Sequence, residues 1–315
     1  PAEGAMWMLI CDQINSDIKN ANQGKPISLL AKWMPSINAS SKEKIKLANI
    51  IAKNFGLAPA QYRKIMSALR EYLNVLETRM SKQEWDKIVY NQIPSRAMTK
   101  YRKSFYRHDG DRFTQYISDV KQGTETIKAG TLYPYDIVEK YIDCRYYGYG
   151  RKGPIDDVLE AQWKALPNYV EGEENVIVMA DVSGSMCGRP MASSIGLAIY
   201  FAERNSGPYK DMFMTFSGRP EFVKLKGESL VEKIANAENA SWQMNTNLEA
   251  AFMKVLSVAI ENRVPATEMP KAIVVISDME IDACASRNWS FYDEMVHRYE
   301  AEGYTIPNIV FWNVN

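Results

Sequence analysis

The sequence predicts an α + α/β protein, in which an all-helical module is followed by a doubly wound, mostly parallel sheet. Up to about residue 145, apolar residues recur at helical spacing and no strand-like alternation interrupts them. After residue 171, short buried-strand runs alternate with helices, which is typical of a parallel sheet covered on both faces. A length of 315 residues exceeds what one compact core usually holds, so two domains are predicted, residues 1–170 and residues 171–315.

Capping patterns and apolar stripes mark the helices of the first module. Ser40-Ser41-Lys42-Glu43 and Ser81-Lys82-Gln83-Glu84 have the capping-box pattern, in which a Ser oxygen and a Glu carboxylate satisfy free amides at a helix start. Pro59 opens a further helix whose apolar face reaches Leu76. Stacked helix pairs of the solenoid kind fit this module, although no repeat has a fixed period. Further helices are predicted at about residues 4–21, 94–107, 110–122 and 134–145.

A cluster of glycines and a proline at residues 148–154 separates the two patterns, and one more helix is predicted at 156–166. Beyond it, strands and helices alternate. The predicted strands are residues 175–180, 211–216, 221–225, 272–276 and 308–312. The predicted helices are residues 191–204, 228–236, 248–260 and 291–302.

The composition excludes several classes of protein. Hydrophobic residues make up 46% and charged residues 24%, which excludes a disordered or collagenous chain. The longest apolar runs are far shorter than the roughly 20 residues that cross a bilayer, and no signal segment opens the chain. Because the four cysteines (Cys11, Cys144, Cys187, Cys284) are widely spread, free thiols in a reducing cytosol are expected. The absence of an initiator Met indicates a processed chain or a fragment.

A net charge of zero conceals opposite balances in the two halves. Residues 1–170 carry 26 Lys and Arg against 18 Asp and Glu, a balance of +8. Residues 171–315 carry 12 against 20, a balance of −8. Such a division favours a basic binding module joined to an acidic one.

Hydroxyl and carboxylate residues follow two predicted strands of the second module. Asp181, Ser183 and Ser185 come directly after strand 175–180, and Asp278 follows strand 272–276. Thr246 precedes the helix that begins near residue 248. Because the carboxyl ends of the strands form the binding crevice of an open α/β sheet, we expect these residues to meet there. Such an all-oxygen set suits Mg²⁺ first, with Mn²⁺ or Ca²⁺ as alternatives, and does not suit zinc.

The order Asp-x-Ser-x-Ser, then Thr, then Asp resembles the metal-ion-dependent adhesion site of von Willebrand factor A-type domains. The resemblance implies that the serines and the threonine ligate the metal, while the aspartates bind it directly or through water. It also implies one open ligand position for an acidic group of a partner. A turn that only caps the next helix is the alternative interpretation of Asp181–Ser185. The implied metal residues are Asp181, Ser183, Ser185, Thr246 and Asp278.

Other segments are similar to the family of domain of unknown function 2828, found in bacteria, phages and plants. Its members have a helical region followed by a von Willebrand A-like domain, and the resemblance covers nearly the whole chain. A more distant likeness is to the Ro autoantigen (TROVE) proteins, in which a ring of helical repeats closed by such a domain binds small RNAs. It implies a HEAT- or TROVE-like helical module. The segments similar to the first family are residues 30–36, 40–43, 72–75, 101–105 and 132–135.

One basic segment of the first module supports RNA binding. Cations there would neutralise phosphates while exposed rings stack on unpaired bases. The competing interpretation is an amphipathic helix whose aromatic residues pack inward and whose Lys and Arg face solvent. The basic residues are Arg96, Lys100, Arg102, Lys103 and Arg107, interleaved with Tyr101, Phe105 and Tyr106.

The leading hypothesis is a non-enzymatic protein that engages an acidic residue of a protein partner through a divalent cation. The alternatives are an RNA-binding scaffold for small structured or single-stranded RNA, and a phage structural or packaged protein. A metal-dependent hydrolase is disfavoured because no general base is evident, and no phosphate-binding loop of the usual ATPase pattern exists. The expected location is the cytoplasm, or the virion if a phage encodes the chain, with no membrane partner.

Overall fold

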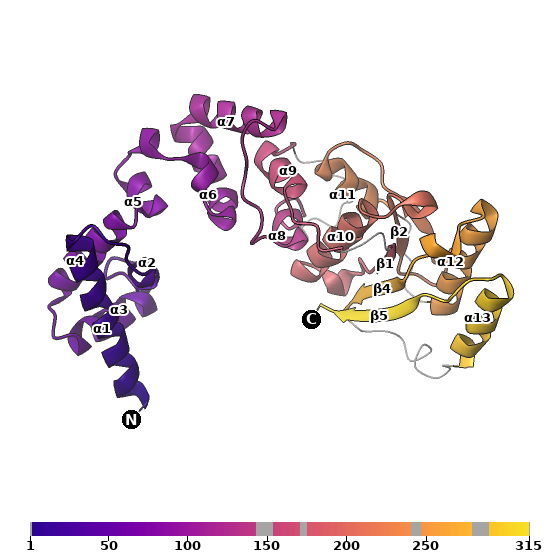
Figure 1. Cartoon of the computed structure of the whole chain (residues 1–315), viewed down its shortest axis with the longest axis horizontal. Coiled ribbons are helices and arrows are strands. Elements are labelled where there is room, and N and C mark those ends of the chain that lie inside the picture. The colour runs from indigo at the N-terminus through magenta and orange to yellow at the C-terminus, as the bar shows by residue number, and fades with distance from the viewer. Residues whose placement is uncertain (1, 143–153, 171–174, 241–246, 279–289, 315) are drawn as a thin grey trace. The chain divides into compact units, whose positions relative to one another are not determined.

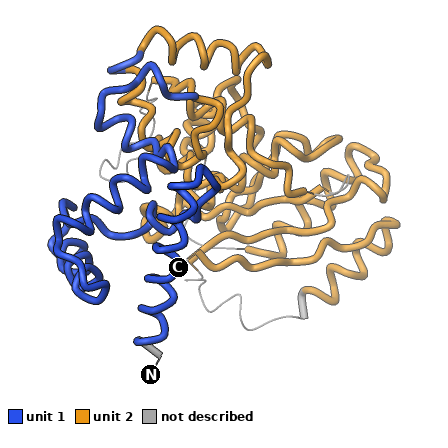
Figure 2. Tube along the Cα trace, turned by 60° about the vertical axis from the view of Figure 1, so that its left-hand side comes forward, with its two compact units in different colours: residues 1–89, 107–109 blue, residues 90–106, 110–315 orange. Residues whose placement is uncertain are grey.

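The computed structural model describes residues 2–142, 154–170, 175–240, 247–278 and 290–314. The chain forms two compact units, residues 1–89 with 107–109 and residues 90–106 with 110–315 (Figure 2). The first unit is helical. The second contains the sheet together with most of the helical residues between residue 90 and the sheet.

The helices of the first unit surround a small apolar core (Figure 1). Its central side chains include Ala48, Tyr62 and Met66, all almost fully buried. Arg70 donates hydrogen bonds to the carbonyl oxygens of Ala31 and Met34 at 2.9 and 2.6 Å, so it satisfies carbonyls at the end of a short helix. The elements of this unit are α1 (Ala2–Asn22), α2 (Leu30–Trp33), α3 (Lys42–Asn54), α4 (Pro59–Tyr72), α5 (Leu76–Ser81) and the 3₁₀ turn η1 (Trp85–Lys87).

The predicted start of α3 is confirmed, whereas the predicted end of α4 is too late. Ser41 is the N-cap of α3, and its hydroxyl accepts a hydrogen bond from the Lys44 amide at 3.4 Å. The apolar stripe of α4 continues to Leu76, but the helix ends at Tyr72. Asn74 adopts a left-handed conformation with φ 52°, which a continuous α-helix does not allow.

The second capping-box pattern does not start a helix, and that prediction was wrong. α5 ends at Ser81, whose hydroxyl donates to the carbonyl of Glu77 at 2.8 Å, and Gln83 has a left-handed φ of 59°. Glu84 does not cap a helix, because it accepts hydrogen bonds from Arg79 and Lys87. These two bonds lower the pKa of Glu84 to about 2. Because the Glu84 carboxylate is engaged in these ion pairs, it does not accept the helix-start amide that a capping box requires.

Among the helices of the second unit that precede the sheet, α8 is much shorter than predicted, and α9 ends two residues earlier than its predicted range of 156–166. These elements are the 3₁₀ turn η2 (Tyr90–Gln92), α6 (Ser95–His108), whose last two residues belong to the first unit, α7 (Gly110–Gln122), α8 (Pro134–Val138) and α9 (Asp157–Lys164). The predicted helices at 94–107 and 110–122 are therefore confirmed. The predicted helix 134–145 ends at Val138, and its last three residues lie outside the described residues.

The sheet has five strands in the order β3-β2-β1-β4-β5. β1 pairs in parallel with β2 and β4, and β4 with β5, so the predicted mostly parallel sheet is confirmed. β3 is antiparallel to β2 because only residues 216–221 join them, and a parallel return needs a crossover of about a dozen residues or more. The strands are β1 (Val176–Ala180), β2 (Met212–Thr215), β3 (Phe222–Lys224), β4 (Ala272–Ser277) and β5 (Asn308–Asn313).

Helices cover both faces of the sheet, as the alternating pattern predicted (Figure 1). On β1, Val178 and Ala180 pack in the cluster that contains α10, whereas Ile177 and Met179 pack in the cluster of α12 and α13. β1 and β4 therefore read as continuous apolar runs, since side chains on both faces are buried. The helices of these layers are α10 (Arg189–Ala202) and α11 (Leu230–Glu238) on one face, and α12 (Leu248–Asn262) and α13 (Ser290–Ala301) on the other.

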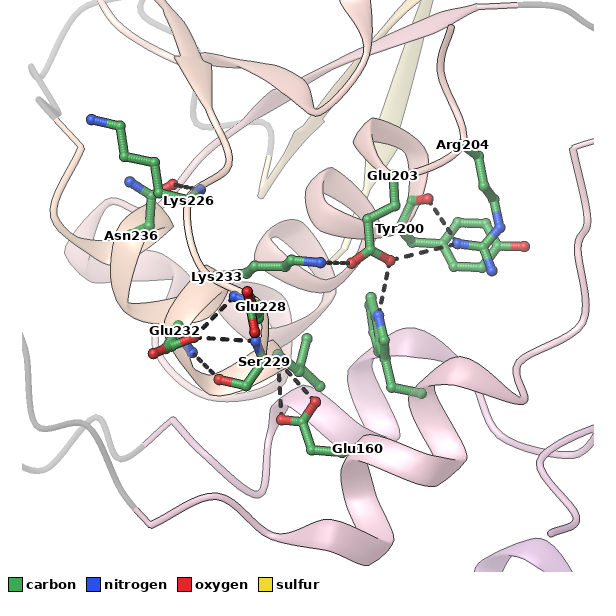
Figure 3. A network of polar contacts seen from close by, with 12 residues as sticks. Glu160, Tyr200, Glu203, Arg204, Lys226, Glu228, Ser229, Glu232, Lys233 and Asn236 are labelled. Carbon is green, nitrogen blue, oxygen red and sulfur yellow. Dashed lines mark hydrogen bonds and ion pairs between the residues drawn. The ribbon is translucent and has the colours of Figure 1, made fainter. Parts of the chain in front are cut away.

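The helices α8 and α9 pack on the α10 face of the sheet. A Cβ atom at Gly196 of α10 would lie 3.2 Å from Pro134 of α8, so the close approach of these helices requires glycine. Trp163 of α9 donates to the Glu203 carboxylate at 2.9 Å. Glu160 of α9, only 9% exposed, accepts hydrogen bonds from the Leu230 amide at 2.9 Å and so caps the start of α11 (Figure 3).

None of the described helices has the length and apolar character needed to cross a membrane. Cys11 is a free thiol, Cys187 is exposed, and Cys144 and Cys284 lie outside the described residues.

Replacing Glu160 by Ala should lower the free energy of unfolding by about 2 kcal/mol, because the first amides of α11 lose a buried charged acceptor. Urea denaturation measures this loss. Glu228→Ala is the matched control, since Glu228 lies exposed just before the same helix and its carboxylate receives none of these amides. Equal losses for the two variants would contradict the capping role of Glu160.

Candidate functional site

The topology of the sheet has a switch point between β1 and β4. From β1 the chain passes through α10 to β2, whereas β4 lies on the opposite side of β1 and leads on to α13. The chain thus leaves these adjacent strands toward opposite faces, and such a switch point at the carboxyl ends of the strands is the usual binding crevice of an open α/β sheet. Asp181 follows β1 directly, and its amide donates to the carbonyl of Ile276 on β4 at 3.1 Å. Asp278 follows the last residue of β4.

Asp181 is a buried carboxylate held by two hydrogen bonds. It is 4% exposed. Its Oδ1 atom accepts from the Ser183 amide at 2.8 Å, and its Oδ2 atom accepts from the Ser277 hydroxyl at 2.8 Å. Within the part of the chain that the structure describes, Asp181 forms no ion pair with Lys, Arg or His. A buried carboxylate that lacks a cationic partner is costly, so this position favours a cation.

Ser277 joins the two predicted aspartates. Its hydroxyl is fully buried and lies 3.5 Å from the Oδ1 atom of Asp278, which is 8% exposed, in addition to its bond to Asp181. Sequence analysis did not include Ser277 among the candidate site residues. A usable signal was present, because Ser277 is the single hydroxyl residue at the end of an otherwise apolar strand.

Ser183 and Ser185 present two exposed hydroxyls beside Asp181. Their Oγ atoms lie 3.1 Å apart, and the 3₁₀ turn η3 (Gly184–Met186) carries Ser185. The bond from the Ser183 amide to the Asp181 side chain closes an Asx turn, which bends the loop immediately after the strand. The structure therefore brings together four of the five predicted metal residues in one region of the sheet edge.

The fifth predicted metal residue, Thr246, lies outside the described residues. The residue after it, Asn247, donates its amide to the carbonyl of Ser217 at 3.2 Å and caps α12 with its side chain. Ser217 and Thr215 are buried at the carboxyl end of β2, with hydroxyl oxygens 3.5 Å apart. Sequence analysis passed over these two hydroxyls, since neither lies in the recognised motif.

The donor atoms at this edge are carboxylate and hydroxyl oxygens. Among the described residues, no three His, Cys, Asp or Glu side chains gather into a group that could hold a metal. The set consists instead of two carboxylates with serine hydroxyls, the donor chemistry that hard cations such as Mg²⁺ accept and zinc does not prefer.

The basic residues predicted to contact RNA differ in their surroundings. Arg102 is paired with Asp156 at 2.6 Å and its side chain is only 12% exposed, so it serves the fold. Phe105 is fully buried within a cluster of aromatic rings. Three basic residues that remain exposed lie on one face of α6 and belong to the second unit, namely Arg96, Lys100 and Lys103. Arg107 is exposed and belongs to the first unit.

Residues 52–173 match the family model described as Domain of unknown function (DUF2828). This match supports the assignment of residues 52–173 to that family. The similar segments at 72–75, 101–105 and 132–135 fall within the match, while those at 30–36 and 40–43 precede it. Residues 175–315 match a second family model, Domain of unknown function (DUF7788), which includes all the strands of the sheet.

The chain is similar to "Uncharacterized protein L728" of Acanthamoeba polyphaga mimivirus. The two sequences are 32% identical over 329 residues, which cover 97% of this chain and 56% of the viral protein. The chain therefore spans little more than half the length of that relative. No solved structure matches the chain.

Replacing Ser277 by Ala should lower the free energy of unfolding by about 2 kcal/mol in the presence of EDTA, because the buried Asp181 carboxylate loses a hydroxyl donor. The measurement is urea denaturation. Ser217→Ala is the matched control, since its equally buried hydroxyl makes only a 3.5 Å contact. If both variants lose the same stability, the link between Ser277 and Asp181 has no special energetic role.

Proposed function

We propose that this protein binds a divalent cation at the carboxyl ends of β1 and β4 and uses the bound cation to engage a carboxylate of a protein partner. The ligands are Asp181, Ser183, Ser185 and Asp278, with Thr246 as the fifth, in a site of the von Willebrand A type. Mg²⁺ is the first candidate for the cation, and Mn²⁺ and Ca²⁺ share its preference for oxygen.

The observation that carries this proposal is that Asp181 is buried beside a second buried carboxylate and has no cationic partner among the described residues. One hydroxyl, that of Ser277, lies within hydrogen-bond range of both aspartates, at 2.8 and 3.5 Å. Two charged carboxylates that lie within range of one hydroxyl repel one another. A bound cation would offset both this repulsion and the cost of removing the carboxylates from water. The exposed hydroxyls of Ser183 and Ser185 leave the cation accessible from solvent.

The role in binding follows from the number of protein ligands. The described donors and Thr246 do not enclose a cation that takes six ligands or more, so at least one position is filled by water or by a partner oxygen. A carboxylate of a partner is the charged oxygen ligand best suited to this position. The described site contains neither a histidine nor a lysine that would act as a general base, which favours binding over hydrolysis.

Replacing Asp181 by Asn should weaken Mg²⁺ and Mn²⁺ binding at least about tenfold, the equivalent of 1.4 kcal/mol. The amide keeps the shape of the side chain and an acceptor for the Ser183 amide, but removes the charge. Isothermal titration calorimetry of the full chain measures the affinity. Asp211→Asn is the matched control, because Asp211 precedes β2 at the opposite edge of the sheet and its left-handed backbone suits Asn.

Thermal unfolding in EDTA establishes that each variant is folded. Unchanged affinity in Asp181→Asn, or equal losses in Asp181→Asn and Asp211→Asn, would overturn the metal site. Binding of acidic peptides on an array, compared in Mg²⁺ and in EDTA, tests the partner carboxylate separately.

The RNA-binding scaffold and the phage structural or packaged protein stay alternative predictions, as do cytoplasmic and virion locations. Because one relative comes from a giant virus, the virion stays an alternative location for this protein. The burial of Arg102 removes one residue from the proposed RNA surface.

A further inference from the structure

Two tyrosines stack at the start of α8 in the second unit, where Tyr133 is exposed and Tyr135 is partly buried against the core. The rings of Tyr133 and Tyr135 have centroids 5.7 Å apart and an interplanar angle of 14°. Tyr133 is 53% exposed, and its hydroxyl makes no hydrogen bond with any described residue. Because a large ring left in water without a polar partner contributes little to folding, the stack indicates a surface for a ligand.

The backbone holds this stack rigidly. Tyr133 lies between Leu132 and Pro134, which are both buried, and its amide donates to the Asp136 carboxylate at 2.9 Å. Pro134 occupies the first turn of α8, where its fixed φ favours the helix start. A ligand that stacks on Tyr133 therefore meets a ring whose main chain is already ordered, which lowers the entropic cost of binding.

Cationic side chains flank the two rings. The guanidinium of Arg189 lies over the Tyr135 ring, 5.2 Å from its centroid, and the Arg189 side chain is 68% exposed. Arg96 is 63% exposed and runs beside the same segment, where it donates to the Thr131 carbonyl at 3.4 Å. Lys100 and Lys103 extend this charge along the exposed face of α6.

The nearby carboxylates do not cancel this positive charge. Asp136 caps α8 and lies 3.6 Å from Arg96, while Glu139 is paired with Lys140 at 2.6 Å and lies 3.9 Å from Arg189. Both acids therefore have other partners, and the four cations outnumber them. The arginine contacts at 3.6 and 3.9 Å are long and leave guanidinium donors available.

We propose that Tyr133 stacks on an unpaired base of a single-stranded nucleic acid while Arg96 and Arg189 contact the adjoining phosphates. Flat, exposed aromatic rings between arginines are the usual chemistry of such sites. This surface differs from the α6 set that the sequence suggested, because Arg102 and Phe105 are buried. It does not depend on the proposed cation site.

The test is fluorescence anisotropy of the full chain with labelled oligouridylate and oligothymidylate of about 15 nucleotides, in EDTA and at low salt. We expect binding that Tyr133→Ala weakens about 5- to 150-fold, the range of one lost base stack. Tyr133→Phe should retain the affinity, and Tyr133→Leu should lose it, because the aromatic face is required. Arg96→Ala should lower the dependence of log affinity on log salt by about one.

Tyr169→Ala is the matched control, because Tyr169 is 55% exposed on the same unit and has no arginine over its ring. Its affinity should equal that of the unmodified chain. Failure to bind either oligonucleotide would overturn the proposal, as would equal losses in Tyr133→Ala and Tyr169→Ala. Full affinity in Tyr133→Leu would also overturn it, because an aromatic face would then not be required. A difference between the two oligonucleotides would identify RNA or DNA as the ligand.

Discussion

The parallel pairing of β1 with β4 is the constraint on which the candidate site depends. Residues 176–180 lie opposite residues 272–276 in register, so the residues that follow the two strands emerge at the same edge of the sheet. Both strands are apolar on both faces, and a slip of one residue would exchange the faces of every side chain. The packing of α10 on one face and α12 on the other therefore fixes the separation of Asp181 and Asp278.

Once the register is fixed, the two carboxylates lie near each other at the edge of the sheet. The Ser277 hydroxyl donates to Asp181 and lies within range of Asp278. A single hydroxyl supplies one proton, so it cannot donate fully to both carboxylates at once. The proposed cation would meet this demand, and the resulting site would be tied to the strand register and would not depend on a particular loop conformation.

Sequence reasoning succeeded where one local signal stood alone and failed where another residue, near or distant in the sequence, bound the same group. The strands, the four helices of the sheet layers and the positions of Asp181 and Asp278 follow from apolar periodicity and from the residues directly after each strand. The capping pattern at Ser81 failed because Arg79 and Lys87 bind the carboxylate of Glu84. Arg102 was predicted to contact RNA, but it forms an ion pair with Asp156, which is distant in the sequence. Such pairings arise only when the chain folds, and no periodicity encodes them.

The same limit applies to the Tyr133–Tyr135 stack. Its four letters, Leu-Tyr-Pro-Tyr, were noted as a mark of the family, and alternating tyrosines around a proline do not reveal whether either ring is exposed. Tyr133 is exposed, whereas its neighbours Leu132 and Pro134 are buried. Arg189, which lies over the Tyr135 ring, comes from a helix far along the chain.

The contact of Glu160 with α11 crosses the boundary between the segments that the two family models match. The two family models meet between residues 173 and 175, whereas α9 supplies the buried acceptor for the first turn of α11 and packs Leu159 into the core on the same face of the sheet. A sheet half that recombined behind an unrelated helical region would lose this acceptor unless the new region delivered another. In this chain, the segments matched by the two models therefore share one interior, and neither is expected to keep its full stability without the other.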